Sequence, residues 1–325
     1  MQKNLILAFL TVLFLNCSNS NDNSPEPDPT QIVDSGNPAI GCTDANAKNF
    51  KTTATTEDCS CQYDFPSSVS TSIPSDFTRK ILIEEHTGTW CGWCPMAKET
   101  MRKLSENQRV IGVEIHYNDE MTDAEKFYNP LKSKYGSPAF PSGMINRRKS
   151  IVGTTFIIGT DDWAANVDDY LKTEKTSVGL AIESRLNGKN LEVLSHLNFK
   201  SSTSDKYGLG IYLVEDKVTG YPQMNYLARN AQFQRFEAYK LPALIENIEH
   251  HNVSRDAITP ILNGLEIPLA ATKDGKTFRK LFKTILPNSV KKAENCYIIA
   301  FIVNNKTGEI TNVQKVAIGK SKSWD

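Results

Sequence analysis

The chain has 325 residues, and its 37 basic residues balance 37 acidic ones. This even charge, without a long basic run, excludes nucleic acid as the main partner. The 39% of hydrophobic residues is ordinary for a globular protein and leaves room for two or more domains.

Residues 1–17 form a predicted lipoprotein signal peptide. Lys3 precedes the apolar run LILAFLTVLFL, which is too short for an ordinary membrane-spanning helix but suits the core of a secretory signal. Asn16 and Cys17 follow, an ending that resembles a bacterial lipobox, although Asn16 replaces the small residue usual there. We expect Cys17 to be the lipidated N-terminus of the mature protein. The alternative is a plain signal peptide that is cut nearby.

The next segment, residues 18–40, is rich in Ser, Asn, Asp and Pro and nearly free of large apolar residues. Such a segment cannot bury enough surface to offset its chain entropy, so we expect a disordered tether. A lipid followed by a tether would hold the folded part at a membrane surface. The rest of the sequence has no segment as long and apolar as a membrane span.

Residues 41–64 are predicted to form a small cysteine module. The segment GCTDANAKNFKTTATTEDCSCQY resembles a short module in exported proteins of Gram-negative gliding and gut bacteria. The resemblance implies a disulfide between Cys42 and Cys61. Cys59 departs from the module, because glycine is usual at that position.

The chain has seven cysteines, and export makes disulfides plausible. Once Cys17 and the close pair at 91 and 94 are set aside, four remain, which permit three pairings. By elimination, Cys59 is a candidate to pair with Cys296 and clamp the module to the C-terminal half. The rival interpretation is a zinc site on Cys59 and Cys61. Ligands one residue apart, without a second complete pair, argue against it.

The segment TWCGWCP opens a predicted helix over 91–107, after a predicted buried strand at Ile81–Glu85. Four apolar residues recur at helical spacing on one face of this helix, namely Cys94, Ala97, Met101 and Leu104. We therefore expect Cys94 to point inward and Cys91 to be exposed at the helix N-terminus. Lys98 is expected on the solvent side.

This geometry assigns chemistry to the cysteine pair. Free N–H groups and the helix dipole favour a thiolate at Cys91, which lowers its pKa and makes it the nucleophile. Attack on a substrate disulfide gives a mixed disulfide, which Cys94 resolves. The alternative is a small inert bridge.

The pattern WCGWC on a strand-to-helix turn resembles the thioredoxin superfamily, and we assign residues 75–175 to a thioredoxin-like α/β domain. The resemblance implies a cis-proline opposite the cysteines. The segment YGSPAFPSGMINRR supplies it at Pro141, with the Phe140–Pro141 bond cis, and Pro138 is the weaker candidate. A strand at Val110–Tyr117, a helix at 123–135 and a helix at 160–173 complete the expected domain.

Thioredoxins often carry a buried acid on the strand before the active site, which assists proton transfer at the resolving cysteine. Counting back from Cys91 favours Glu85 for this role, whereas counting from the strand start favours Glu84. His86 is expected to be a polar loop residue.

Residues 176–325 are predicted to form an all-β sandwich with an Ig-like arrangement. Val178, Leu180 and Ile182 alternate with polar residues, and Asn187-Gly188 is a strong hairpin turn. An irregular segment at 221–264 interrupts the strands. Its adjacent histidines, 250 and 251, should diverge on a strand, so we expect no metal site.

Several phrases together resemble the Omp28-related family of outer-membrane proteins: the lipobox, EEHTGTWCGWCP, the Pro141 loop, YLVEDKV, HHNVSRDAI and TNVQKVAI. The resemblance covers roughly residues 75–325. It implies an anchored protein of the cell envelope, an outer-membrane lipoprotein on the periplasmic or the surface face. It also implies a thioredoxin-like domain followed by a β domain, and some members are discussed as surface adhesins or receptors.

Two functions follow as hypotheses. The first is a thiol-disulfide oxidoreductase in which Cys91 attacks and Cys94 resolves. Its partners would be the thiols and disulfides of exported proteins and a redox partner, and it would need no cofactor beyond its own disulfide. The second is an adhesin or binding lipoprotein that uses the thioredoxin-like fold as a scaffold. A peroxidase of the peroxiredoxin type is disfavoured, because the Pro-x-x-x-Thr-x-x-Cys motif is absent.

Overall fold

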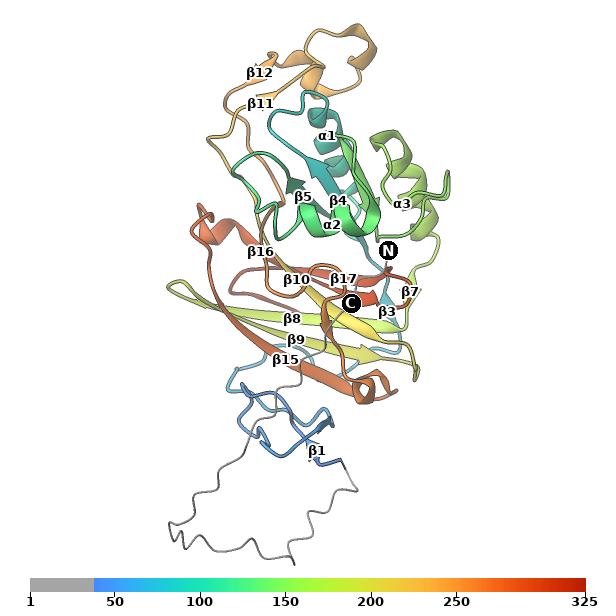
Figure 1. The fold of residues 1–325 in the computed structure, drawn as a ribbon, viewed down its shortest axis with the longest axis vertical. Coiled ribbons are helices and arrows are strands. Elements are labelled where there is room, and N and C mark those ends of the chain that lie inside the picture. The colour runs from blue at the N-terminus through green and yellow to red at the C-terminus, as the bar shows by residue number, and fades with distance from the viewer. Residues whose placement is uncertain (1–37) are drawn as a thin grey trace, which may run out of the picture. The chain divides into compact units, whose positions relative to one another are not determined.

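Strands dominate the computed structural model, which describes residues 38–325 (Figure 1). The α-helices of these residues are α1 (Cys94–Leu104), α2 (Tyr128–Tyr135) and α3 (Trp163–Leu171). Within 38–325, no helix has both the length and the apolarity needed to cross a membrane. The predicted signal peptide, Cys17 and most of the predicted tether lie outside the described residues.

The larger sheet has eight strands in the order β17-β16-β10-β13-β5-β4-β6, with β14 paired to β10. The strands are β4 (Ile81–Thr87), β5 (Val110–His116), β6 (Ser142–Ile145), β10 (Tyr207–Glu215), β13 (Val253–Ala257), β14 (Leu265–Glu266), β16 (Cys296–Asn304) and β17 (Ile310–Ala317). The pairs β4–β5 and β5–β13 are parallel, whereas the other neighbours are antiparallel.

The smaller sheet has four strands in the order β15-β9-β8-β18. They are β8 (Val178–Asn187), β9 (Asn190–Phe199), β15 (Thr277–Ile285) and β18 (Ser321–Lys322). The predicted hairpin turn joins β8 to β9, and Gly188 has a left-handed φ of +58° there. Leu180 and Leu197 of this sheet pack in one core with Ile211 and Ile298 of the larger sheet.

Short elements complete the description. The two-stranded ribbons are β1 (Ile40–Gly41) with β2 (Thr56–Glu57), β3 (Phe77–Thr78) with β7 (Lys175–Thr176), and β11 (Gln223–Met224) with β12 (Leu244–Ile245). The 3-10 turns are Thr160–Asp162, Ala231–Phe233, Glu237–Lys240, Leu269–Thr272 and Ala293–Asn295.

The two predicted regions on either side of residue 175 share the larger sheet. Strand β13 pairs in parallel with β5 at Val253 and Glu114, and the Glu114 N–H donates to the carbonyl of Asn252 (2.8 Å). The C-terminal strands therefore extend the sheet that carries the cysteine pair. This arrangement differs from the prediction of an α/β domain followed by a separate sandwich, because the edge of β5 is an open partner for β13.

The helices cover opposite faces of β4 and β5. On one face, Ile81 and Ile83 pack with Ala97 of α1 and with Trp163 of α3. On the other face, Ile111, Val113 and Ile115 of β5 pack with α2 and with β10. Since successive strand residues point to opposite faces, each residue of β4 is assigned to one of these two environments.

A buried ion pair ties β4 and β6 to the C-terminal half. The Arg147 guanidinium, just after β6, donates Nε–H to Glu84 Oε2 and Nη2–H to Glu84 Oε1, each at 2.7 Å. The Tyr212 hydroxyl of β10 donates to Glu84 Oε1 (2.9 Å), and Arg147 also bonds the carbonyls of Ile261 and Leu262. Both charged side chains are fully buried, so each depends on the other.

Replacing Arg147 by Met should lower the free energy of unfolding by about 3–5 kcal/mol, because the Glu84 carboxylate would then be buried without its partner. Arg148→Met is the matched control, since the Arg148 side chain is 39% exposed and its pair with Asp169 is at the surface. We expect that change to cost less than about 1 kcal/mol. Urea unfolding of both variants measures the difference, and equal losses would contradict a special role for Arg147.

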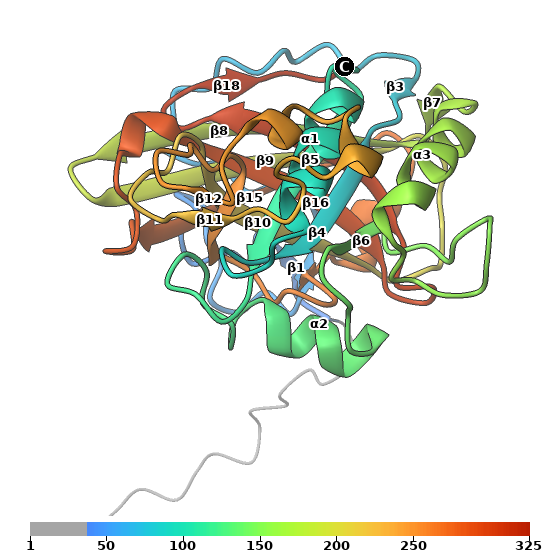
Figure 2. The ribbon, with the colours of Figure 1, turned by 90° about the horizontal axis from the view of Figure 1, so that it is seen from above.

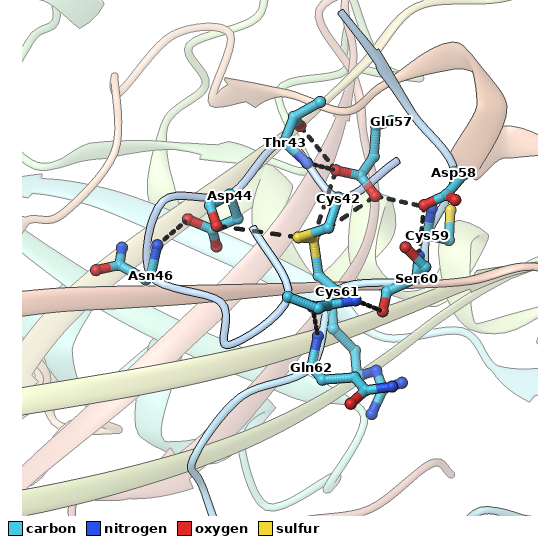
Figure 3. Close-up of a disulfide and its surroundings, with 12 residues drawn as sticks. Cys42, Thr43, Asp44, Asn46, Glu57, Asp58, Cys59, Ser60, Cys61 and Gln62 are labelled. Carbon is cyan, nitrogen blue, oxygen red and sulfur yellow. Dashed lines mark hydrogen bonds between the residues drawn. A yellow bond between two sulfur atoms is a disulfide. The ribbon is translucent and has the colours of Figure 1, made fainter. Parts of the chain in front are cut away.

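The small cysteine module is held by a disulfide between Cys42 and Cys61, the pairing that the resemblance implied (Figure 3). The Glu57 carboxylate, beside this disulfide, accepts from the backbone N–H groups of Thr43 (2.9 Å) and Cys59 (2.8 Å). The module docks on β15, where Asp44 pairs with Lys280 at 3.0 Å. A disulfide and one buried carboxylate thus organise a segment with little apolar core of its own.

Cys59 and Cys296 are free thiols, so their predicted pairing is wrong. Cys59 lies near Lys276, at the end of the two packed sheets where Ile267 bonds Tyr207 at the start of β10. Cys296 pairs with Glu215 at the other end of β10. Strand β10 has nine residues, so its two ends lie eight residue steps apart, a span of roughly 27 Å. The rival zinc site on Cys59 and Cys61 fails as well, because Cys61 is in the disulfide.

The backbone explains why glycine is usual at position 59. Cys59 has a φ of 67°, in the left-handed region that glycine adopts without steric cost. Burial and the nearby Glu57 charge raise the pKa of the Cys59 thiol to about 11. Burial and the Glu215 charge raise the pKa of Cys296 to about 12. Both thiols are therefore protonated at neutral pH and poorly reactive.

Peptide mapping without reduction checks this assignment. After unfolding in an alkylating reagent, the peptides that contain Cys59 and Cys296 should each carry the alkyl group. Cys42 and Cys61 should appear as one cross-linked pair of peptides, which serves as the internal control. A cross-link between Cys59 and Cys296 would contradict the structure.

Candidate functional site

Cys91 and Cys94 form a disulfide at the N-terminus of α1. Cys94 is the first residue of the helix, and Pro95 follows it, where the missing N–H costs nothing. Cys94 is fully buried, as the helical spacing predicted, and lies one turn before Ala97, which packs in one core with β4. Residues 88–92, called here the cysteine loop, connect β4 to this helix.

The peptide bond between Phe140 and Pro141 is cis, and among the described residues it is the one such bond. Pro141 stands directly before β6, which pairs antiparallel with β4 so that Ser142 lies beside His86. The Phe140 ring contacts the ring of Trp90, the residue before Cys91, with centroids 5.1 Å apart. The proline chosen from the sequence thus lies beside the cysteine loop.

Cys91 is only 4% exposed, so the expectation of an exposed nucleophile is wrong in this conformation. The cover comes from residues 219–249, called here the lobe, which hold β11 and β12 (Figure 2). In the sequence this stretch lies within the irregular segment 221–264. It has no clear periodicity, so nothing in the sequence placed it over the cysteines.

The lobe bonds directly to the cysteine loop. Its contacts are the N–H of Met224 to the carbonyl of Thr89 (2.8 Å), the N–H of Tyr226 to the carbonyl of Gly92 (2.7 Å), and the side-chain amide of Gln223 to the carbonyl of Cys91 (2.9 Å). The rings of Tyr226 and Phe233 also pack on Trp93, at 5.5 and 5.2 Å between centroids. The aromatic residues of the irregular segment are thus part of the site.

Glu85 is the acid that faces α1. Strand alternation puts it on the side of Ile81 and Ile83, which pack against this helix, while Glu84 points to the other side and pairs with Arg147. Both carboxyl oxygens of Glu85 are buried without a hydrogen-bond partner. Burial and the neighbouring Glu114 charge raise the pKa of Glu85 well above 4.5, so the fold favours the protonated form of this carboxyl.

Beside Glu85 lies a buried chain of charged and polar groups. The Lys98 ammonium of α1 donates to Glu114 Oε2 (2.8 Å) and contacts His250 Nδ1 (2.7 Å). His116 lies between the carboxylates of Glu114 (3.1 Å) and Asp119 (2.8 Å). Burial opposes the ionisation of Glu114, but Lys98 and His116 outweigh it and lower its pKa to about 2.

This chain corrects the expected position of Lys98. The helical pattern placed its side chain in solvent, but it is only 13% exposed and reaches inward to Glu114. Burial and the Lys98 charge lower the pKa of His250 to about 3, so its ring is neutral. A neutral ring accepts from the ammonium through Nδ1 and donates from Nε2 to the carbonyl of Tyr221 (2.8 Å).

Glu114, His116 and His250 lie close enough together to hold a metal ion. The Lys98 ammonium, however, already contacts two of the three ligand atoms, and His116 bonds carboxylates through both ring nitrogens. The geometry therefore favours an internal ion-pair network. The adjacent His251 is exposed and pairs with Glu249 instead, since neighbouring side chains diverge.

His86 is a strand residue and not the polar loop residue expected. It lies within β4, is buried, and packs edge-on against the Tyr128 ring of α2 (6.3 Å between centroids). Neither ring nitrogen has a hydrogen-bond partner. Burial lowers the pKa of His86 to about 4, so the ring is neutral at physiological pH. This side chain faces away from α1 and the buried Glu85.

A cavity of about 1180 Å³ lies on the α1 side of the larger sheet. Its lining includes Lys98 and Met101 of α1, Ile245 at the edge of the lobe, and Tyr297 and Lys315 of β16 and β17. Lys98 and Glu114 both line the cavity, so their ion pair forms part of its wall. Cys91 and Cys94 are not among its lining residues.

The state of Glu85 predicts a pH-dependent stability. An unfolded glutamate loses its proton above about pH 4.5, whereas folded Glu85 keeps it, so folding becomes less favourable as the pH rises from 4.5 towards the raised pKa. Glu85→Gln removes this dependence. In the oxidised protein, we expect its stability gain over the native chain to be larger at pH 8 than at pH 4 by at least about 1.4 kcal/mol.

Chemical unfolding at the two pH values measures this difference. Glu84→Gln is the control, because it weakens the bond to Arg147 and should destabilise the protein at both pH values. The same effect of Glu85→Gln at pH 4 and pH 8 would contradict a protonated Glu85.

Three comparisons place the chain among known proteins. The model of the family described as outer membrane protein Omp28 matches residues 128–322, well over half of the chain. The match begins after the cysteine pair and includes Pro141 and the lobe. No curated protein sequence matches this chain.

Among solved structures, HBP35 of Porphyromonas gingivalis has a TM-score of 0.58 at 17% identity, over 76% of this chain and 77% of that one. At this identity the likeness shows a shared fold. A protein of Agrobacterium tumefaciens (TM-score 0.42, 14% identity, 77% and 97% covered) and a domain of the outer membrane lipoprotein Omp28 of Porphyromonas gingivalis (0.28, 18%, 44% and 88%) are more distant. Neither supports an argument.

Proposed function

The chain belongs to the Omp28 family of outer membrane proteins, in agreement with the predicted location, and on that premise we propose that it exchanges thiols and disulfides with exported proteins. Cys91 is the attacking and Cys94 the resolving cysteine. The observation that carries the proposal is the disulfide at the start of α1, with the protonated, unpartnered Glu85 on the facing strand.

The arrangement around the pair supports a thioredoxin-like fold for this part of the chain. Parallel strands β4 and β5 are connected through α1, and β6 runs antiparallel to β4 directly after the cis-proline Pro141. The C-terminal strands would then be an addition to the β5 edge of that fold, and β8, β9 and β15 would complete a sandwich with them.

The exchange balances as two displacements at sulfur. The Cys91 thiolate attacks one sulfur of a substrate disulfide, forms a mixed disulfide, and releases the other substrate sulfur as a thiolate. Cys94, once deprotonated, attacks the Cys91 sulfur, forms the Cys91–Cys94 bond and releases the second thiolate. The substrate gains two electrons and the pair loses two. A dithiol partner restores the reduced pair, and the reverse sequence oxidises a substrate dithiol.

Glu85 is proposed to move the proton at Cys94. A carboxyl that is neutral in the oxidised protein can take up the Cys94 proton only after it has ionised, and the Lys98 ammonium favours that ionisation. The Glu114 carboxylate acts in the opposite direction and disfavours the ionisation of Glu85. Glu85 follows Ile83 by two residues and so lies on the same face of β4, the face on which Ile83 packs in one core with Ala97 of α1.

A second function has its own observation. The cavity of about 1180 Å³ is large enough for a ligand or a peptide segment, and neither cysteine of the pair lines it. In that case the protein would be a binding or adhesion lipoprotein, and the thioredoxin-like part would be its scaffold. Reactivity of the cysteine pair separates the two functions.

Trapping of mixed disulfides tests the proposal. A Cys94→Ser variant is expressed in the cell envelope of the native host. Without the resolving cysteine, the mixed disulfide between Cys91 and a partner persists. We therefore expect disulfide-linked complexes that a reductant separates. Cys91→Ser is the matched control and should trap few or none. After reduction of the native chain, iodoacetamide should modify Cys91 well before Cys59 or Cys296, whose pKa values are raised.

If Cys94→Ser traps no more than Cys91→Ser, and the reduced Cys91 alkylates no faster than the buried thiols, the exchange function fails. The binding function would then be the better account of the fold.

A further inference from the structure

The lobe, residues 219–249, is a small folded unit with a narrow neck. At the neck, the N–H of Val218 donates to the carbonyl of His250 (2.9 Å) and the N–H of His250 donates back to Val218 (2.8 Å). Leu227, Phe236 and Ala238 form the core of the lobe, and Met96 of α1 packs against this core from outside. Two ends held by one bridge and an internal core allow such a unit to move as a body.

Backbone conformation at the neck fits a hinge. Gly220, the second residue of the lobe, has a φ of +90°, which glycine adopts at little steric cost. Asn252, just after the neck, has a φ of 53°. In proteins with moving lids, a few residues at the two ends of the lid absorb the change in φ and ψ that the motion requires.

Hydrogen bonds hold the lobe to the cysteine loop, and in each of them the lobe supplies the N–H donor and the cysteine loop the carbonyl acceptor. Met224 and Tyr226 donate their N–H groups to Thr89 and Gly92. The amide nitrogen of Gln223 lies 3.2, 3.1 and 2.9 Å from the carbonyl oxygens of Gly88, Thr89 and Cys91. Gln223 itself is fully buried, and its Oε1 has no partner.

These bonds control access to sulfur. An incoming thiolate must approach a disulfide sulfur directly, but Cys91 is 4% exposed and Cys94 is fully buried. The bonds are made to Thr89, to Cys91 itself and to Gly92 directly after it, so release of the lobe would free the backbone on both sides of Cys91.

We propose that the lobe is a gate over the Cys91–Cys94 disulfide and that Gln223 and Tyr226 hold it closed. The biological role of this gate rests on the proposed function, because a gate has a role only if the cysteine pair reacts with partner proteins. Gln223 and Tyr226 act through the cysteine loop, so they are positioning residues. The reaction rate is then set by the fraction of molecules in which the lobe is open.

The test uses the oxidised full chain and dithiothreitol as the reductant. Gln223→Ala removes the buried amide, and Tyr226→Ala removes the ring that packs on Trp93. Each should speed reduction of Cys91–Cys94 by roughly tenfold, as expected when a few favourable contacts of the closed state are lost. Tyr239→Ala is the matched control in the same lobe, since it makes no contact with the cysteine loop among the contacts of residues 38–325.

Hydrogen exchange supplies the second measurement. The amide protons of Met224 and Tyr226 should exchange faster in the same two variants, whereas protection in β4 and β5 should stay as in the native chain. Preserved protection in those strands separates an opened gate from a misfolded variant. In the native chain, dithiothreitol reduction should accelerate under mild urea together with exchange at Met224 and Tyr226.

Two results would overturn the gate. One is faster amide exchange in the variants with unchanged reduction, and the other is unchanged exchange and unchanged reduction in both. Failure of the proposed function gives a different pattern, because dithiothreitol needs no biological partner. Reduction that responds to the lobe, combined with no partner trapped by Cys94→Ser, would keep the gate and reject exchange with exported proteins.

Discussion

The parallel pairing of β13 with β5 fixes the positions of the other parts. It joins the C-terminal strands to the edge of the sheet that leads into the cysteine pair, at Val253 and Glu114. The chain between β10 and β13 must therefore leave and return beside β5, and the lobe lies in that connection. Its cover over Cys91 is a consequence of where a long connection can go once the two strands are paired.

Two neighbouring glutamates of β4 point to opposite faces of the sheet and therefore lie in very different environments. Glu84 and Glu85 are neighbours, yet one lies against a guanidinium with every oxygen bonded, and the other lies in a site without a hydrogen-bond partner. The first arrangement holds two parts of the protein together. The second costs folding free energy at neutral pH, and such costs are characteristic of sites that handle protons.

The sequence was informative where local periodicity determines structure. The spacing of Cys94, Ala97 and Met101 predicted the inward face of α1, and the resemblance to thioredoxins led to the cis bond before Pro141. The choice between Glu84 and Glu85 needed the strand register. The lobe contacts the cysteine loop from more than a hundred residues away, and Lys98 turns inward to Glu114 on the neighbouring strand and to the distant His250. No local pattern records these contacts.

The predicted pairing of Cys59 with Cys296 was wrong because it came from counting the remaining cysteines. Such a count contains no information about the distance between two cysteines in the fold.

Gly92 carries a constraint that reaches beyond its own loop. A Cβ at this position would clash with the ring of Tyr226, so a larger residue between the two cysteines requires that ring to move. The dipeptide between paired cysteines is the usual place where such proteins adjust their reduction potential. If the pair exchanges disulfides as we propose, a substitution at Gly92 would therefore change the packing of the lobe together with the reduction potential.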